Sequence, residues 1–224
     1  MAGEAQERKS SATAGAPLRP QAAAVAILAG GEGRRIGGQK ACVRLGSLAL
    51  IDYPLAAARA AGLRAVVIAR ERTQLPKLDC ELLREPDLDP HPLRGVLSAL
   101  AYARGHPIVV VACDMPFVPA ALLADLASAP QSTVCAPYGE LQPLLGCYHP
   151  DAAGELSRAL DAGAGARAAL RNIDAHTLDE AALARFGDPD RMCVNVNDAE
   201  ELARASALLV DAAPAGLGAR VAAG

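Results

Sequence analysis

The chain has 224 residues, of which 52% are hydrophobic, so it can bury one sizeable core and falls within the size range of a single domain. Its formal net charge of -3 excludes a general attraction to nucleic acid or to an anionic membrane surface, and we expect a small-molecule partner instead. Six cysteines without a Cys-x-x-Cys pair, and four histidines that form no short metal-ligand pair with a cysteine, indicate reduced thiols in a cytoplasmic protein and argue against zinc.

The two ends of the chain lack the periodic apolar pattern of folded segments. Residues 1–20 are rich in Ala, Gly, Ser and charge, and we expect a disordered leader there. Residues 210–224 are expected to form a flexible tail. The apolar run that begins at Ala22 is too short to span a bilayer and continues into a glycine loop, which argues against an export signal. The sequence therefore predicts a single domain over residues 21–209.

Between these ends, short β-branched runs alternate with longer amphipathic runs rich in Ala and Leu. This alternation is typical of the α/β class, in which helices cover a parallel sheet. In chain order, strands are expected at residues 23–28, 65–69, 81–84, 108–112, 133–136, 144–148 and, from a weaker pattern, 176–178. Helices are expected at residues 52–61, 93–103, 119–127, 151–160, 166–172 and 198–208. Ligands of such sheets bind at the carboxyl ends of the strands, so the loops there carry the functional prediction.

The loop after the first strand is rich in glycine and in positive charge. It lies within "AILAGGEGRRIGGQKA", residues 26–41. Glycines let the backbone approach a ligand closely, and Arg35 and Lys40 supply the charge that a phosphate group would attract. For Arg34 the sequence leaves phosphate binding and plain solvent exposure equally open. We therefore predict a phosphate-binding loop.

The spacing of this loop excludes two common phosphate-binding motifs. A P-loop requires Gly-Lys followed by Ser or Thr, but Gln39 separates the last glycine from the lysine and Ala41 has no hydroxyl group. The dinucleotide fingerprint Gly-x-Gly-x-x-Gly fails because Ile36 occupies the position of the third glycine. A dehydrogenase is thus not expected.

A second loop follows the apolar strand predicted at residues 108–112 and contains Asp114. Burying a carboxylate without a partner is costly, so this residue needs a structural or chemical reason. One reading is a cap for the helix that begins near Pro119, but the spacing disfavours it. The other is a ligand of Mg²⁺, which prefers oxygen donors and uses only one or two protein carboxylates. We predict Mg²⁺ as the cofactor.

Five stretches resemble, in order, the motifs of one enzyme family. Residues 28–40 resemble the signature loop of nucleotidyltransferases that use a nucleoside triphosphate to cap a phosphorylated acceptor, and "CDMPF", residues 113–117, resembles their metal-binding strand end. "PLRGVLSAL", "LQPLLGCY" and "VNVNDAEEL" are similar to the Gly-Pro-Leu-x-Gly segment, the Gln/His-Pro strand and the Asn-Ile-Asn ending of the molybdenum cofactor guanylyltransferases. The chain therefore resembles that family over most of residues 26–202.

The resemblance implies a fold, a reaction and partners. The fold would be three-layered and Rossmann-like, similar to the nucleotide-diphospho-sugar transferases, with a mostly parallel sheet and helices on both faces. The reaction would be transfer of GMP from GTP to the phosphate of molybdopterin, with release of pyrophosphate and with Mg²⁺ as cofactor. A protein of molybdoenzyme maturation would be a further partner.

The resemblance also assigns site residues. The catalytic residues would be Arg35, Lys40 and Asp114, and the metal ligands Asp114, Asn195 and Asn197. The nucleotide would be bound by Leu28, Ala29, Gly30, Gly31, Gly33, Arg35, Lys40, Asp87 and Asp114. Glu85 and Asp89 are rival choices for the role of Asp87. For the two asparagines, a structural role at the start of the last helix remains an alternative.

The chain departs from the family pattern at several positions near the base and the acceptor. Gln39 replaces an aspartate, residues 47–51 lack the family's lysine and proline, and His91 replaces a glycine. The asparagine expected after the second strand is replaced by Arg70 or Glu71. A transferase that uses CTP or another phosphorylated acceptor therefore remains an alternative. A non-catalytic nucleotide or cofactor chaperone is a third, disfavoured because both the lysine and the aspartate of the site are retained.

Overall fold

The computed structural model describes residues 23–31 and 33–211, so the predicted leader and all but the first two residues of the predicted tail lie outside the described residues. A seven-stranded sheet has the order β5-β4-β1-β6-β8-β7-β9. Neighbouring strands are parallel, except that β8 runs antiparallel to both β6 and β7. The strands are β1 (Ala24–Leu28), β4 (Arg64–Arg70), β5 (Glu81–Glu85), β6 (Ile108–Ala112), β7 (Thr133–Cys135), β8 (Leu145–Tyr148) and β9 (His176–Leu178).

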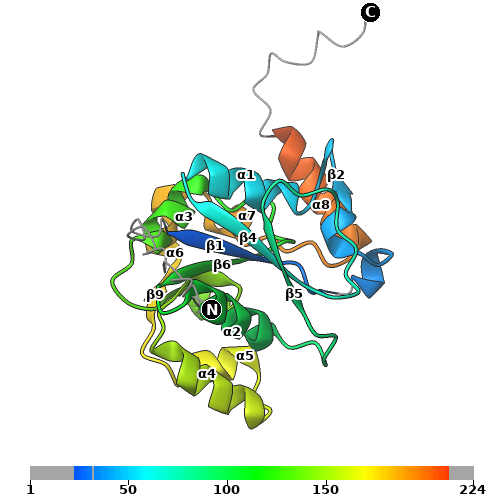
Figure 1. Ribbon diagram of the computed structural model, residues 1–224. Coiled ribbons are helices and arrows are strands. Elements are labelled where there is room, and N and C mark those ends of the chain that lie inside the picture. Colours follow the sequence, from blue (N-terminus) through cyan, green and yellow to red (C-terminus); the bar gives the residue numbers. More distant parts are fainter. Residues whose placement is uncertain (1–22, 32, 212–224) are drawn as a thin grey trace, which may run out of the picture.

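Helices cover both faces of this sheet, which confirms the predicted three-layer α/β fold (Figure 1). One core cluster joins one face to α1 (Asp52–Ala60) and α3 (Ala120–Ala127), and a second joins the other face to α2 (Pro92–Ala103), α4 (Ala152–Asp161) and α5 (Ala166–Leu170). Strand β1 shows why: Val25 and Ile27 belong to the first cluster, and Ala24, Ala26 and Leu28 to the second. Because both faces are buried, its sequence is a continuous apolar run.

A third, smaller core lies beside the carboxyl edge of the sheet. The hairpin β2 (Arg44–Leu45) and β3 (Leu48–Ala49) packs there against α8 (Ala199–Asp211), as Figure 1 shows. Its buried members are Leu45, Leu50, Val196 and Ala205. The glycine loop and the segment before α8 are thus anchored on one small apolar cluster, although they lie far apart in the sequence.

The elements that the sequence did not predict are short. They are the hairpin, the helices α6 (Glu180–Leu183) and α7 (Pro189–Met192), and the 3-10 turns η1 (Arg34–Ile36), η2 (Lys40–Cys42), η3 (Pro137–Gly139) and η4 (Ala184–Phe186). Four residues make about one helical turn, too few for a 3.6-residue period to show. Helix α8 ends at Asp211, two residues beyond the predicted domain boundary. In the part of the chain that the structure describes, no helix combines the length and apolar character needed to cross a bilayer.

Candidate active site

The two loops predicted to carry the site follow β1 and β6, which are neighbours in the sheet. β1 pairs with β6 in parallel, with Leu28 opposite Ala112. The backbone N–H of Cys113 donates to the carbonyl of Leu28 at 3.0 Å, so the ladder extends to the first residue of the second loop. The carboxyl ends of parallel strands meet at one edge, as predicted, and both loops begin there.

Three segments meet in a buried polar cluster at this edge. The Lys40 ammonium forms an ion pair with the Oδ2 atom of Asp114 and donates to Oδ1 of Asn197 at 2.6 Å. Lys40 is only 8% exposed and Asp114 only 9%. The backbone N–H of Val196 donates to the carbonyl of Asp114 at 3.0 Å, which fixes the third segment on the second. The structure therefore brings together three of the residues that the sequence analysis assigned to catalysis and metal binding.

The second carboxylate oxygen of Asp114 has no partner. Its Oδ1 atom is buried and receives no hydrogen bond from any residue in the described ranges 23–31 and 33–211. An unpartnered carboxylate oxygen is costly to bury, and a bound cation would satisfy it. Asn197 and the half-buried Asn195 line one cavity together with Asp114. The Nδ2–H group of Asn195 donates a hydrogen bond to the Cys193 carbonyl at 3.0 Å, so the side-chain oxygen of Asn195 remains available as an acceptor.

This donor set fits Mg²⁺. Among the residues that the structure describes, no group of three or more His, Cys, Asp or Glu side chains is placed to hold a metal. A site with one carboxylate and neutral amide oxygens suits a hard cation that keeps waters and takes its remaining ligands from substrate phosphates. The neighbouring thiol adds no reactivity, because burial and the Asp114 carboxylate raise the pKa of Cys113 well above its usual range. The cluster provides charge but no nucleophile.

The glycine loop folds back onto Lys40. Gly33 has φ +58°, and a side chain there would lie 3.0 Å from both Cβ and the backbone N of Lys40. A glycine is therefore required for the close return of the chain. Gln39 also adopts a left-handed conformation, with φ 52°, at the position where the resembling family has aspartate. Such a conformation is uncommon for a residue with a side chain and is stored strain next to the site.

The other cation predicted in this loop is placed differently. Arg35 is exposed and forms no hydrogen bond or ion pair with the described residues, so the structure does not bring it to Asp114. It remains a prediction that it binds phosphate. The side chain of Arg34 lies outside the described part of the chain.

A cavity of about 210 Å³ lies beside the glycine loop. Leu28, Gly30 and Gly31, all predicted to bind the nucleotide, form one wall of it. Ala29 lies beneath, 1% exposed, with its N–H donating to the β4 backbone. On the opposite side α2 approaches so closely that a side chain at Gly95 would lie 2.8 Å from Cδ1 of Leu28. The cavity is small and largely apolar, as a site for a flat heterocycle should be.

Two polar side chains enter this small cavity from the ends of β4 and β5. The Nε–H group of Arg70 donates a hydrogen bond to the carbonyl of Gly30 at 2.8 Å and so holds the glycine loop against the end of β4. Glu85 is paired with Arg70 in the strand register, and its Oε1 atom is buried without a hydrogen-bond partner among the described residues. Asp89, the other rival choice, also lines this cavity, but of the two only Glu85 has a buried carboxylate oxygen without a partner among the described residues.

Asp87, which the sequence analysis preferred to Glu85, has another environment. Its carboxylate pairs with Nε of Arg72 at 3.1 Å, and it borders a neighbouring cavity of about 400 Å³. The predicted strand ended at Arg84, one residue too early, and this placed Glu85 in the loop rather than at the edge of the sheet. Glu85 thus lines the small cavity and Asp87 the neighbouring one, and nucleotide binding by Asp87 stays a prediction.

His91 takes over a structural task at the position where the family has glycine. Its Nδ1 atom accepts a hydrogen bond from the backbone N–H of Leu93 at 3.2 Å and so caps α2. The Nε2 atom, which then carries the proton, contacts the carbonyl of Ala164 at 3.1 Å. The substitution preserves the start of α2 and still allows the helix to reach the small cavity.

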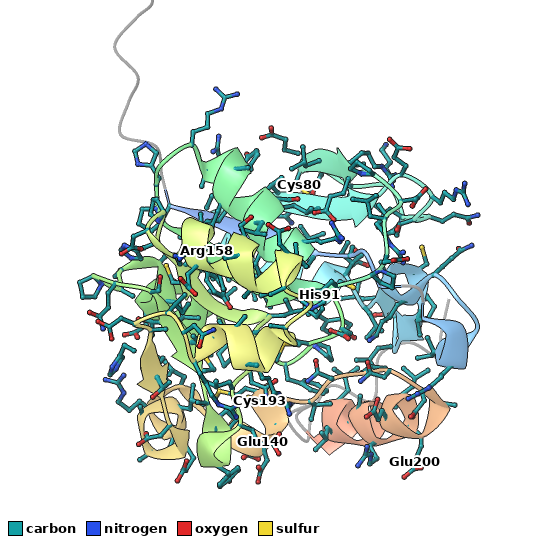
Figure 2. All side chains as sticks on the ribbon, turned by 90° about the horizontal axis from the view of Figure 1, so that it is seen from below. Cys80, His91, Glu140, Arg158, Cys193 and Glu200 are labelled. Atoms are coloured by element: carbon teal, nitrogen blue, oxygen red, sulfur yellow. The ribbon has the colours of Figure 1, made fainter. Side chains whose placement is uncertain are left out.

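A second cavity, of about 1040 Å³, opens on the other side of Asp114. Pro92 and Leu144 border both this larger cavity and the small one, so the two adjoin. Besides Asp114, three arginines and four acidic residues line the larger cavity; they are Arg167, Arg191, Arg204, Glu140, Asp188, Asp190 and Glu201. Glu140 and Cys193, both from its wall, are labelled in Figure 2. None of these side chains was predicted as a site residue, because they come from separate elements whose proximity depends on the whole fold.

Comparison with protein families gives one match that covers most of the chain. Residues 25–181 match the model of the MobA-like NTP transferase domain. The matched segment begins with the first strand and includes both loops described above.

Individual proteins show the same likeness. The chain is 34% identical over 196 residues to the molybdenum cofactor guanylyltransferase of Cereibacter sphaeroides, covering 82% of this chain and 95% of that relative. It is 32% identical over 127 residues to the probable molybdenum cofactor guanylyltransferase of Carboxydothermus hydrogenoformans, covering 55% of this chain and 64% of the relative. The crystal structure of molybdopterin-guanine dinucleotide biosynthesis protein A from Archaeoglobus fulgidus is similar with a TM-score of 0.71 and 27% identity, covering 84% of this chain and 98% of that one.

Proposed function

The chain belongs to the MobA-like NTP transferase family and is a nucleotidyltransferase, and on this premise we propose that it transfers GMP from GTP to the phosphate of molybdopterin. The observation that carries the proposal is the position of Asp114. Asp114 lines the larger cavity and has one buried oxygen without a partner among the described residues, and its ion-pair partner Lys40 belongs to the glycine loop beside the small cavity. The guanosine would occupy the small cavity, the acceptor the larger one, and the triphosphate the space between them.

The proposed reaction is a single in-line displacement. An oxygen of the acceptor phosphate attacks the α-phosphorus of GTP, a new P–O bond forms, and the bond between the α-phosphorus and the bridging oxygen breaks. Pyrophosphate leaves with that electron pair. The second pKa of a phosphate monoester is about 6, so the attacking group is largely dianionic at neutral pH and needs no general base. This agrees with a site that has cations and a carboxylate but only a protonated thiol.

The residues of the site would act mainly by positioning and by charge. The backbone of residues 28–33 would hold the triphosphate, and Lys40 and Arg35 would offset its negative charge. Mg²⁺, held by Asp114 with the amide oxygens of Asn195 and Asn197, would supply further positive charge where the two phosphate groups meet. Lys40, which also donates to Asn197, orients the Asp114 carboxylate before the substrates arrive.

Glu85 supports a preference for guanine. Guanine has neighbouring N–H groups at N1 and N2, and one carboxylate can accept both, whereas cytosine offers only its exocyclic amino group on that edge. Glu85 lines the small cavity, and its buried Oε1 atom has no hydrogen-bond partner among the described residues. A ligand that donates two hydrogen bonds would satisfy this carboxylate.

Pyrophosphate release tests the proposal. Purified protein is mixed with Mg²⁺, molybdopterin and one nucleoside triphosphate at a time, and reactions without acceptor provide the background. Of the nucleoside triphosphates, we expect only GTP to release pyrophosphate in the presence of molybdopterin. Asp114→Asn is expected to lower the rate of this release at least about 100-fold. Release with CTP would instead support the cytidylyl alternative, and no release with any nucleotide would support a binding protein. The proposed reaction would take place in the cytoplasm, with the product passed to a protein of molybdoenzyme maturation.

A further inference from the structure

The three arginines of the larger cavity differ in what they already bind. The Nε–H group of Arg167 donates a hydrogen bond to the Leu141 carbonyl at 3.1 Å, and its guanidinium forms an ion pair with Glu140 at 3.4 Å. Arg204 pairs with the neighbouring Glu201 at 3.8 Å and is 66% exposed. The guanidinium of Arg191 forms no hydrogen bond or ion pair with any residue in the described ranges, although it is half-buried. Arg191 is therefore the arginine whose donors remain free for a ligand.

The Arg191 side chain is nevertheless held in place. Its guanidinium lies over the ring of Phe117, with Cζ 4.9 Å from the centre of the ring. A guanidinium stacked in this way keeps its N–H donors in the plane and at its edge, where they can bind two oxygens of a phosphate together. Most of the ordering cost of a long side chain is thus met before a ligand binds.

This stacked pair joins the two chain segments that form the metal site. Phe117 lies in the loop that begins with Asp114, and Arg191 lies in α7, directly before the segment that carries Asn195 and Asn197. The carbonyl of Arg191 accepts a hydrogen bond from the N–H of Val194 at 3.2 Å. The free guanidinium therefore lines the same cavity as Asp114 and both asparagines.

The charges of the cavity show why such a group is needed. The proposed acceptor brings a phosphate dianion toward the triphosphate, and Lys40 lies on the triphosphate side. Besides Asp114, the cavity walls carry four carboxylates, from Glu140, Asp188, Asp190 and Glu201. A dianion enters such surroundings only if a cation compensates for its lost hydration.

We propose that Arg191, stacked on Phe117, binds the phosphate monoester of the acceptor. The identity of the acceptor rests on the proposed function. The subsite itself, which binds a phosphate monoester at α7 and is separate from the triphosphate loop, does not depend on it. The guanidinium binds and orients the phosphate, and the paired Arg167 and Arg204 contribute only to the general field.

A binding experiment tests the subsite without any turnover. The probe is phenyl phosphate, observed by ligand-detected NMR with the full-length protein, Mg²⁺ and α,β-methylene-GTP. Arg191→Ala is expected to weaken binding about 10- to 100-fold, and Arg191→Lys less, because a lysine keeps the charge but loses the planar fork. The matched control Arg204→Ala removes the same charge from the same cavity and is expected to change binding less than about twofold.

Phe117→Leu gives a second variant that keeps the arginine. It removes the aromatic face, and we expect about 2- to 5-fold weaker binding, in line with a partly exposed cation–π contact. Wild-type binding of the probe by Arg191→Ala, or an equal loss in Arg204→Ala, would overturn the proposal. Unfolding by urea confirms that each variant is folded before it is titrated.

Kinetics separate this proposal from the proposed function. In the pyrophosphate assay, Arg191→Ala is expected to raise the KM for molybdopterin about 10- to 100-fold and to leave the affinity for the GTP analogue unchanged. A selective effect on GTP would contradict the subsite. If the wild-type protein releases no pyrophosphate with any nucleotide, the proposed function fails, whereas the phenyl phosphate titration still decides on Arg191.

Discussion

Lys40→Met removes the ammonium group from a buried carboxylate that has no other charged partner among the residues the structure describes. The methionine side chain is similar in length and shape, so the space around it stays filled. What changes is the charge: Asp114 is 9% exposed, one of its oxygens is already unpartnered, and the other loses the Lys40 ion pair. Asn197 also loses the donor that now lies 2.6 Å from its side-chain oxygen.

The expected cost follows from this burial. Removing one member of a buried ion pair costs about 3–5 kcal/mol, because the remaining charge is left without compensation. For a domain of this size, 1 kcal/mol corresponds to about 2–4 °C in Tm, so Lys40→Met should lower Tm by about 6–20 °C. The double variant Lys40→Met with Asp114→Leu removes both charges and is expected to regain at least half of the loss.

Urea unfolding followed by circular dichroism provides the measurement. The matched control is Arg59→Met, since Arg59 forms an ion pair with Asp79 in which both side chains are 70% exposed. Solvent screens that pair, and its loss should cost less than about 1 kcal/mol. Unfolding free energies of Lys40→Met and Arg59→Met within 1 kcal/mol of each other would refute the reasoning, because the Lys40 pair would then behave as an exposed one.

Mg²⁺ extends the same experiment to the metal site. In the nucleotide-free protein the ammonium and the cation compete for the oxygens of Asp114 and Asn197, so Lys40→Met should be stabilised by Mg²⁺ more than the wild type. A ligand at 100 times its Kd contributes about 2.7 kcal/mol to the form that binds it. Equal stabilisation of both proteins by Mg²⁺ would show that the lysine and the metal do not share these oxygens.

Three further predictions concern other parts of the molecule. A side chain at Gly146 would lie 2.6 Å from the carbonyl oxygen of Thr133, a backbone atom that cannot move aside. Gly146→Ala is therefore expected to lower the unfolding free energy by about 1–3 kcal/mol. An unchanged urea midpoint would contradict this. Gly95→Ala would push Leu28 toward the small cavity, so we expect weaker binding of α,β-methylene-GTP in calorimetry with little loss of stability. Burial raises the pKa of Cys193 to about 11, so only about 0.1% of this thiol is thiolate at pH 8. Its rate of alkylation by iodoacetamide should therefore rise about tenfold per pH unit up to that pKa. A plateau of the rate near pH 9 would refute the shift.

The sheet and its helices could be predicted because their signals are local. Strands buried on both faces, such as β1 and β6, appear as continuous apolar runs, and each predicted strand is found within two residues of its predicted ends. The antiparallel direction of β8 left no such signal. Its residues are as apolar as those of a parallel strand, and the direction depends on the turn at η3 and on its pairing with both β6 and β7.

The choice between Glu85 and Asp87 shows where local reading fails. Both carboxylates occur within three residues of each other in an acidic stretch. The register of β5 on β4 decides that Glu85 lies at the edge of the small cavity, whereas Asp87 turns to Arg72. Register is a property of two strands, and a shift of one residue reverses the face on which every side chain lies.

The α/β class, the glycine loop with its lysine, and the aspartate that ends an apolar strand can be recognised in the sequence, because each depends on neighbours a few positions apart. The contacts of Lys40 with Asp114 and Asn197, which are 74 and 157 positions away, and the stacking of Arg191 on Phe117 appear only in the folded chain. Contacts over such separations form only when the packed layers bring the strand ends and the segment before α8 together. The chemistry of the site is therefore visible in the residue types, and its geometry only in the fold.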